Sequence, residues 1–152
     1  MLIYWIERKH QARFGGASTI DSSALGFLLG LNLSGIVCLQ EDTSSETLSQ
    51  ILGVLWLHNP MITGTPPSEV ELLQIVSFVR DCEKIGSKRP ILFHSESGLN
   101  RPGTILAALL IILDGLSPDS AINQIQAINP LTLSNHADYR FVSGLKPGSA
   151  NQ

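Results

Sequence analysis

Short apolar runs alternate with longer segments of helical spacing along this chain. Four runs, at residues 2–6, 35–39, 54–57 and 91–93, have the length and the bounding turn residues of strands. The run at 35–39 is apolar throughout, which is typical of a strand buried on both faces of a sheet. We expect the first run to lie at the edge of the sheet and the glycine pair at 15–16 to break it.

Helices are predicted between the strands by capping residues and by apolar positions three and four apart. Asp21 or Ser22 caps a helix that carries four leucines, and a short helix is expected within the polar segment 41–49. Ser68 and Glu71 form a capping box that begins a helix through about residue 83. The remaining helices are expected at 102–113, from 117 to the Asn-Pro pair at 129–130, and at 134–145.

The segment 102–113 is apolar almost all round, so we expect it to be the buried central helix, with Gly115 at its end. Alternating strands and helices indicate an α/β fold of three layers, with a short, mostly parallel central sheet of four or five strands flanked by helices. We expect one domain over residues 1–145 and a flexible C-terminal tail over 146–152.

The composition narrows the class of protein without pointing to a function. The chain has 152 residues, of which 43% are hydrophobic and 15% charged, and this suffices for one folded core without metals or disulfides. The net charge of −3 argues against general nucleic-acid binding. We interpret Cys38 and Cys82 as reduced core thiols, which fits a cytoplasmic protein.

No membrane association is expected. The apolar start of the chain reaches Glu7 too early for a signal peptide, and the run 105–113 is far shorter than the ~20 residues of a membrane helix. The histidines show no metal-ligand spacing with cysteine or acidic residues, so neither a metal nor a cofactor is predicted. Nothing in the sequence fixes an oligomeric state, and a monomer is our expectation.

Residues 94–101 read His-Ser-Glu-Ser-Gly-Leu-Asn-Arg and join the strand at 91–93 to the central helix. The main-chain N–H groups of such a tight loop can point to a common centre, and the helix dipole adds positive potential. An arginine at the start of the helix can clamp two oxygens of a phosphate at once. The pattern predicts a cradle for an anion such as phosphate or sulfate. The predicted phosphate-binding residues are Ser95, Glu96, Ser97, Gly98, Leu99, Asn100 and Arg101.

This loop resembles the active-site signature of the cysteine-dependent protein tyrosine and dual-specificity phosphatases, in which His, Cys, five residues and Arg are followed by Ser or Thr. Other segments also look like those of compact microbial dual-specificity phosphatases, namely 4–6, 35–41, 57–60, 67–68, 103–107, 120–122 and 129–130. The resemblance covers nearly the whole chain and implies the fold of that family. It also implies a phosphorylated protein or peptide, or another phosphoryl ligand, as the partner.

Three kinds of group carry the reaction of that family. A cysteine of low pKa attacks phosphorus, an arginine and the loop amides bind the equatorial oxygens, and an aspartate on an earlier loop protonates the leaving oxygen. The resemblance assigns phosphate binding to Arg101, the loop glycine to Gly98, and orientation of the loop to His94.

The remaining positions depart from the family pattern. Ser95 stands at the nucleophile position, Pro102 replaces the hydroxyl residue after the arginine, and Thr63 stands where the acid is expected. Asp138 is the nearest match to a glutamine that helps to position water. A serine hydroxyl is not ionised near pH 7 and needs an adjacent base. His94 is poorly placed for that task, because neighbouring residues of a strand point to opposite faces.

Two hypotheses remain. The favoured one is a pseudophosphatase that binds phosphorylated ligands without hydrolysing them, because Thr63 and Pro102 are altered together with the nucleophile. The alternative is an active phosphomonoester hydrolase, either a cysteine-dependent phosphatase represented with its nucleophile replaced by Ser95 or one that uses unfamiliar groups.

Each site residue also has a plainer interpretation. Arg101 in a structural salt bridge, His94 as an ordinary core histidine, Glu96 facing solvent, and Asp138 as a surface residue or helix cap are the alternatives. A Glu96 that pointed inward would oppose the binding of an anion.

Overall fold

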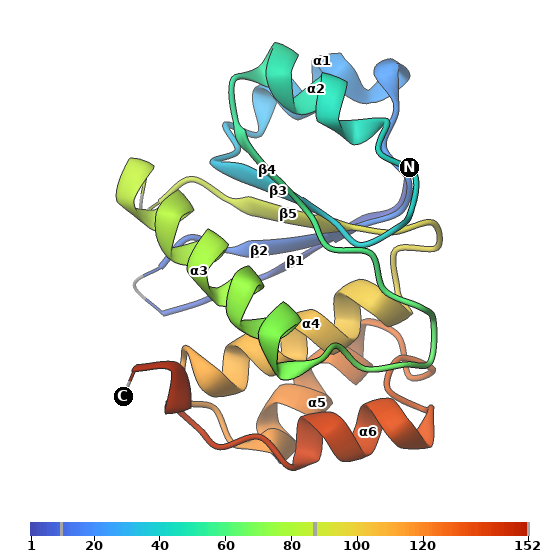
Figure 1. Ribbon diagram of the computed structural model, residues 1–152, viewed down its shortest axis with the longest axis vertical. Helices are drawn as coiled ribbons and strands as arrows, with labels where there is room; N and C mark the ends of the chain where they lie inside the picture. Colours follow the sequence, from blue (N-terminus) through green and yellow to red (C-terminus); the bar gives the residue numbers. More distant parts are fainter. Residues whose placement is uncertain (10, 87, 152) are drawn as a thin grey trace.

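Five strands form one sheet in the computed structural model, which describes residues 1–9, 11–86 and 88–151 (Figure 1). In spatial order they are β1 (Ile3–Ile6), β2 (Phe14–Ala17), β5 (Ile91–His94), β3 (Gly35–Cys38) and β4 (Leu55–His58). β1 runs antiparallel to β2, and the other neighbouring pairs are parallel. The predicted mostly parallel sheet is confirmed, with β1 at one edge. His10, one of the histidines considered for a metal, and Gln152 lie outside the described residues.

The glycine pair at 15–16 lies inside a buried strand, so the predicted strand break is wrong. β2 sits between β1 and β5, where Gly15 faces Trp5 and Gly16 faces Tyr4 across the ladder. A Cβ atom on Gly16 would lie 2.2 Å from the Tyr4 ring, and one on Gly15 would lie 2.6 Å from the Trp5 ring. The glycines therefore make room for two aromatic rings of the edge strand. Glycine is more often a sign of a turn, and for that reason the sequence pattern suggested a break here.

Helices cover both faces of the sheet and complete the three layers (Figure 1). One face carries the 3-10 helix η1 (Ser22–Ala24), α1 (Leu25–Gly30) and α2 (Ser45–Leu52). The other face carries α3 (Glu69–Ile85) and α4 (Asn100–Ile112), while α5 (Pro118–Ile128) and α6 (His136–Ser143) pack beyond α4. All the predicted helices are present, with ends shifted by a few residues.

Local capping chemistry explains where two of these helices begin. The side chain of Asp21 accepts a hydrogen bond from the amide of Ser23 at the start of η1. At α3, the Ser68 hydroxyl accepts from the amide of Glu71 at 3.1 Å, and the Glu71 carboxylate accepts from the amide of Ser68 at 2.9 Å. The predicted capping box is confirmed.

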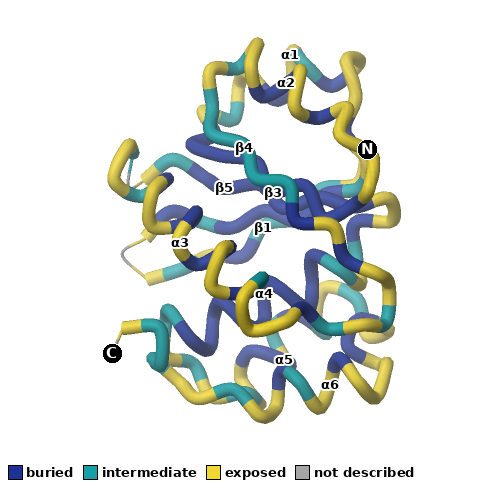
Figure 2. Tube along the Cα trace, viewed as in Figure 1, coloured by how far each residue is buried: buried dark blue, intermediate teal, exposed yellow. Residues whose placement is uncertain are grey.

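α4 is buried along nearly its whole length, as its apolar sequence predicts (Figure 2). The sheet covers one side of α4, and α5 and α6 cover the other. The helix begins at Asn100, two residues earlier than predicted, which places Arg101 in its first turn. Pro102 then occupies the third helical position, where an N–H group would have no partner within the helix.

The carboxyl ends of the parallel strands meet at one edge of the sheet. Cys38, at the end of β3, is in register with His58 of β4 and with His94 of β5. Beyond the strands, the amide of Leu39 donates to the carbonyl of His94 at 2.9 Å, and the amide of Met61 donates to the carbonyl of Leu39 at 2.9 Å. The loops after β3, β4 and β5 are thus joined, and this is the edge at which α/β folds carry their ligand sites.

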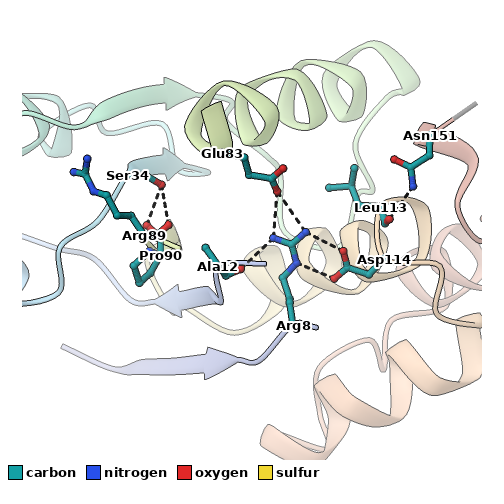
Figure 3. A network of polar contacts seen from close by, with 9 residues as sticks. All are labelled: Arg8, Ala12, Ser34, Glu83, Arg89, Pro90, Leu113, Asp114 and Asn151. Atoms are coloured by element: carbon teal, nitrogen blue, oxygen red, sulfur yellow. Dashed lines mark hydrogen bonds and ion pairs between the residues drawn. The ribbon is translucent and has the colours of Figure 1, made fainter. Parts of the chain in front are cut away.

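A buried arginine holds the opposite end of the sheet together (Figure 3). Arg8, whose side chain is 2% exposed, donates two hydrogen bonds of 2.8 Å to the carboxylate of Asp114. Its guanidinium also lies 3.5 Å from the Glu83 carboxylate and 3.9 Å from the centre of the Phe14 ring. The segment after β1 is thereby linked to α3 and to the end of α4.

The C-terminal residues form hydrogen bonds with the domain. The amide of Gly148 donates to the carbonyl of Ile111 at 2.8 Å, and Asn151 donates to the carbonyl of Leu113 at 2.9 Å (Figure 3). Both acceptors lie at the end of α4, and the Ile111 carbonyl also accepts from the amide of Gly115 at 3.2 Å. The last residues are therefore held against the end of the buried helix.

Cys38 and Cys82 are free and buried, as predicted. Within the described ranges, the chain contains no helix with both the length and the apolar character needed to cross a membrane.

Candidate functional site

The loop at residues 95–99 connects β5 to α4 and is fixed by the strands on both sides of β5. The amide of Ser95 donates to the carbonyl of Ala17, at the end of β2, at 3.1 Å. Thr19 donates its amide to the carbonyl of Glu96 at 3.5 Å. Together with the bond from Leu39 to His94, these contacts hold the loop over the carboxyl ends of three strands.

Gly98 gives the loop its sharp turn. Its φ angle of +82° lies in the left-handed region that favours glycine. A Cβ atom at this position would lie 2.5 Å from the backbone nitrogen of Ser18 and 2.6 Å from the carbonyl carbon of Ala17. The loop can therefore approach the backbone after β2 this closely only with glycine at position 98.

The loop and the first turn of α4 leave a group of main-chain N–H donors unused. Among the residues that the structure describes, no hydrogen-bond acceptor is found for the amides of Glu96, Ser97, Leu99, Asn100 and Arg101. Buried or semi-buried N–H groups normally find a partner, and a loop followed by a helix N-terminus is a common anion site. These amides are the donors that the sequence predicts for an anion.

Arg101 spans the loops that follow β3 and β4. One guanidinium nitrogen donates to the carbonyl of Met61 at 3.3 Å and to that of Leu39 at 3.5 Å. Arg101 forms no ion pair with the acidic residues that the structure describes, so the salt-bridge interpretation does not hold. Arg101 also lines a pocket, described below.

Ser95 lies under the loop rather than on its surface. The residue is fully buried, and its hydroxyl oxygen accepts a hydrogen bond from the amide of Gly98 at 3.2 Å. Five of the loop residues assigned to phosphate binding do not line the pocket beside Arg101 that is described next. They are Ser95, Ser97, Gly98, Leu99 and Asn100. A ligand held by the loop amides would sit above Ser95.

A pocket of about 530 Å³ opens beside Arg101. Of the predicted site residues it brings together Arg101, Glu96 and Thr63, and it does not include His94, Pro102 or Asp138. The other lining residues come from the segment after β2 and from the loops after β3 and β4; they are Thr19, Gln40, Glu41, Asp42, Met61 and Ile62. Glu96 is exposed and is also one of the residues that line the pocket.

The sequence reasoning missed Glu41 and Asp42. Both lie in a polar loop with no periodicity, and nothing local marks them as site residues. The available signal was their place in the chain, directly after a buried parallel strand, since ligand sites form outside the carboxyl ends of such strands. That argument locates the segment but does not say which side chains turn toward the pocket.

Thr63 lines the pocket at the position where the resemblance places a general acid. Its hydroxyl cannot donate a proton as a carboxylic acid does. Asp42 lies in the same lining, but hydrogen bonds from the amide and hydroxyl of Ser44 hold the pKa of its carboxyl below the usual range. The lowered pKa makes Asp42 a weaker proton donor at neutral pH than an unperturbed aspartic acid would be.

His94 faces the α2 side of the sheet. Its Nε2 lies 2.8 Å from the hydroxyl of Ser45, which also accepts a hydrogen bond of 2.9 Å from Nε1 of Trp56. Burial lowers the pKa of His94 to about 4, so the ring is neutral at pH 7. The ring contacts Ser45 rather than Ser95, and its Nδ1 finds no partner among the described residues. These contacts agree with the plainer interpretation of His94 as a core histidine.

Asp138 is buried, contrary to the plainer expectation of a surface residue. It is 5% exposed, and one of its carboxylate oxygens has no partner among the described residues. Burial raises the pKa of this carboxyl. At the start of α6, the side chain of Asn135 accepts hydrogen bonds from the amides of Ala137 and Asp138, so Asn135 is the cap. Asp138 is not itself the cap.

No group of three or more His, Cys, Asp or Glu residues within the described ranges is arranged to hold a metal ion. What the site offers is a set of main-chain amides and one guanidinium at a helix N-terminus. This is the chemistry of an oxyanion receptor.

Comparisons with known proteins agree with this fold and loop. Tk-PTP in its active form superimposes with a TM-score of 0.73 at 23% identity, over 93% of this chain and 92% of that protein. A Cys-to-Ser variant of TpbA from P. aeruginosa, in complex with pTyr, gives a TM-score of 0.71 at 20% identity, over 93% of this chain and 88% of that protein. A protein tyrosine phosphatase from Leishmania major gives 0.79 at 17% identity, over 96% and 99%. At these identities the likeness shows the fold.

Sequence similarity gives the family. A stretch of 75 residues is 35% identical to 197R of Invertebrate iridescent virus 6, a protein named as a tyrosine phosphatase, and covers 48% of this chain and 26% of the viral protein. The molecule thus has the compact architecture of the tyrosine and dual-specificity phosphatases. The chain belongs to the family described as "Polymorphic toxin system, DSP-PTPase phosphatase", whose model matches residues 13–115.

Proposed function

We propose that this chain is a pseudophosphatase, a phosphatase-type domain that binds phosphorylated ligands and does not hydrolyse them. One observation carries the proposal. The anion-binding parts of the loop are complete, with Arg101 and five unpaired amides, whereas Ser95 and Thr63 stand at the positions of the nucleophile and the acid. Such a site retains affinity for a phosphate group but lacks the groups that hydrolyse a phosphomonoester.

Binding needs only the parts that are present. Charge-assisted hydrogen bonds from a guanidinium and from helix-end amides are the strong interactions of phosphate sites. The Cys-to-Ser form of TpbA in complex with pTyr supports this, because it is a protein of the same fold that holds a phosphorylated side chain after such a replacement. A serine in place of a thiolate also removes a negative charge that would repel phosphate.

Turnover needs the parts that are absent. The Ser95 hydroxyl has no base within hydrogen-bond distance among the described residues, since its contact is the amide of Gly98. General acid–base help is worth roughly 10²–10⁴-fold, and its loss at Thr63 compounds the loss of the thiolate. Pro102 further removes the hydroxyl that follows the arginine in the family pattern. We therefore expect no measurable hydrolysis.

The first test compares three proteins on one chromogenic aryl phosphate: the chain itself, Ser95→Cys, and Ser95→Cys/Thr63→Asp. We expect no turnover by the chain, little by the single variant and clear turnover by the double variant, because both the nucleophile and the acid are then restored. Robust hydrolysis by the chain itself or by Ser95→Cys alone would instead favour the active enzyme of the alternative hypothesis.

The second test measures binding. Arg101→Ala is expected to weaken the binding of a phosphotyrosine peptide at least 100-fold, in line with about 3 kcal/mol for the loss of one charged partner. Arg13→Ala is the matched control, because Arg13 precedes β2 at the opposite end of the sheet and is partly exposed. Equal binding by the chain and by Arg101→Ala would contradict the proposal.

A further inference from the structure

The pocket beside Arg101 carries more negative than positive charge. Glu41, Asp42 and Glu96 are among its lining residues, and Arg101 is the single basic residue among the lining residues that the structure describes. The three acidic residues are exposed, and none of them forms an ion pair within residues 1–9, 11–86 and 88–151. The protein itself therefore leaves their charge uncompensated.

Two separate loops supply these carboxylates. Glu41 and Asp42 follow β3, and Glu96 belongs to the loop after β5. The Asp42 carboxylate is fixed by a hydrogen bond of 2.6 Å from the amide of Ser44, and this bond also keeps it ionised. The negative charge is thus a feature of the pocket as a whole rather than of one mobile side chain.

The size of the pocket leaves room for more than a phosphate group. Its volume of about 530 Å³ lies within the range of pockets that hold whole small ligands, roughly 300–1,000 Å³. Arg101 and Glu96 belong both to the phosphate loop and to the pocket lining, so the pocket adjoins the loop. If the loop amides and Arg101 hold the phosphate, the adjoining pocket receives the part of the ligand next to it, beside Glu41, Asp42 and Glu96.

A phosphomonoester alone is a poor match for such a pocket. It carries about −1.5 to −2 charges at pH 7, and like charges across an interface disfavour association. A positive group next to the phosphate would attract the acidic side chains, whereas the phosphate alone repels them. The exposed apolar side chain of Ile62 lines the same pocket and can contact the aliphatic stem of a lysine or arginine.

Resting on the proposed function, we propose that the ligand is a phosphopeptide with lysine or arginine next to the phosphorylated residue, and that Glu41, Asp42 and Glu96 select it. Arg101 and the loop amides hold the phosphate, and the three carboxylates hold the flanking basic side chains. Phosphopeptides with acidic flanks are rejected by the same groups.

The test uses three phosphotyrosine peptides that are identical except for lysine, alanine or glutamate on both sides of the phosphorylated residue. Fluorescence anisotropy measures their affinity at low ionic strength, where surface charges are weakly screened. We expect the lysine peptide to bind at least tenfold more tightly than the glutamate peptide. The unphosphorylated lysine peptide is the control for general attraction between a basic peptide and an acidic protein, and it should bind far more weakly.

The variant Glu41→Gln/Asp42→Asn/Glu96→Gln should reduce this preference to less than threefold, while Asp119→Asn, an exposed carboxylate of α5, should leave it intact. Equal binding of all three phosphopeptides, a preference for the glutamate peptide, or a preference that survives the triple variant would overturn this inference and leave the proposed function standing. If no phosphopeptide binds, the proposed function fails and this inference fails with it.

Discussion

At the scale of single residues, the site joins Arg101 and unpaired loop amides to Ser95 and Thr63, which stand at the positions of the nucleophile and the acid. Arg101 and the loop glycine could be recognised from the sequence alone, because a short loop between a strand and a helix fixes their local geometry. The burial of Ser95 and Asp138 could not, since burial depends on which distant segments cover a residue. Glu41 and Asp42 were missed because the lining of the pocket comes from segments that are far apart in the chain.

Gly98→Ala should destabilise the domain and weaken phosphopeptide binding. The φ angle of +82° and a Cβ position 2.5 Å from the backbone of Ser18 force the loop to move. We expect a loss of about 2–3 kcal/mol in the free energy of unfolding, measured by urea denaturation. Gly53→Ala is the control, because Gly53 has a similar φ of +68° but open space around its Cβ position. An equal loss in both variants would show that the loop does not depend on the close approach.

His94 should make the domain less stable in mild acid. Burial lowers its pKa from 6.5 to about 4, so between these values the unfolded chain binds a proton that the folded chain does not. Stability is therefore complete above pH 6.5 and falls by about 2 kcal/mol between pH 7 and pH 5. In His94→Asn this part of the pH dependence should disappear, as measured by urea titrations at both pH values. A wild-type pH dependence that persists in the variant would refute this origin.

At the scale of elements, the sequence predicted four strands and every α-helix, and it misread one strand. Long helical segments such as 68–83 and 102–113 can be predicted from the spacing of their apolar residues and from their capping residues. β2 does not, because its Gly15-Gly16 pair has the local signature of a turn. The pairing of β2 with β1 explains the two glycines, because Tyr4 and Trp5 fill the space that the missing side chains leave.

Gly16→Ala should therefore cost stability through one specific clash. Its Cβ atom would lie 2.2 Å from the Tyr4 ring, and overpacking of this kind costs about 1–3 kcal/mol. Tyr4→Thr removes the ring, so the double variant should lose less than the sum of the two single losses, as measured in a double-mutant cycle. Strict additivity would indicate that the glycine serves another purpose.

At the scale of the whole molecule, the two ends of the sheet have separate tasks. The carboxyl ends of the strands carry the loop, the pocket and Arg101. The other end is held by Arg8, which joins the segment after β1 to Glu83 and Asp114 (Figure 3). This network joins residues 106 positions apart in the sequence, so no local pattern could predict it.

Arg8→Met should lower the free energy of unfolding by about 3 kcal/mol, because it leaves two partly buried carboxylates without their partner. The triple variant Arg8→Met/Glu83→Gln/Asp114→Asn should be less affected, since no unpaired charge remains. Phosphopeptide affinity should not change in either folded variant, as the network lies at the far end of the sheet. A loss of affinity without a loss of stability would contradict this division of tasks.

The central claim is that the loop holds a phosphomonoester without breaking it. ³¹P NMR of the chain mixed with a stoichiometric amount of a phosphotyrosine peptide at pH 7 observes binding and turnover in one sample. The account predicts a shifted or broadened phosphomonoester signal that persists for hours, no growth of the inorganic phosphate signal, and the spectrum of the free peptide with Arg101→Ala. Accumulation of inorganic phosphate, or an unperturbed peptide signal with the chain itself, would contradict it.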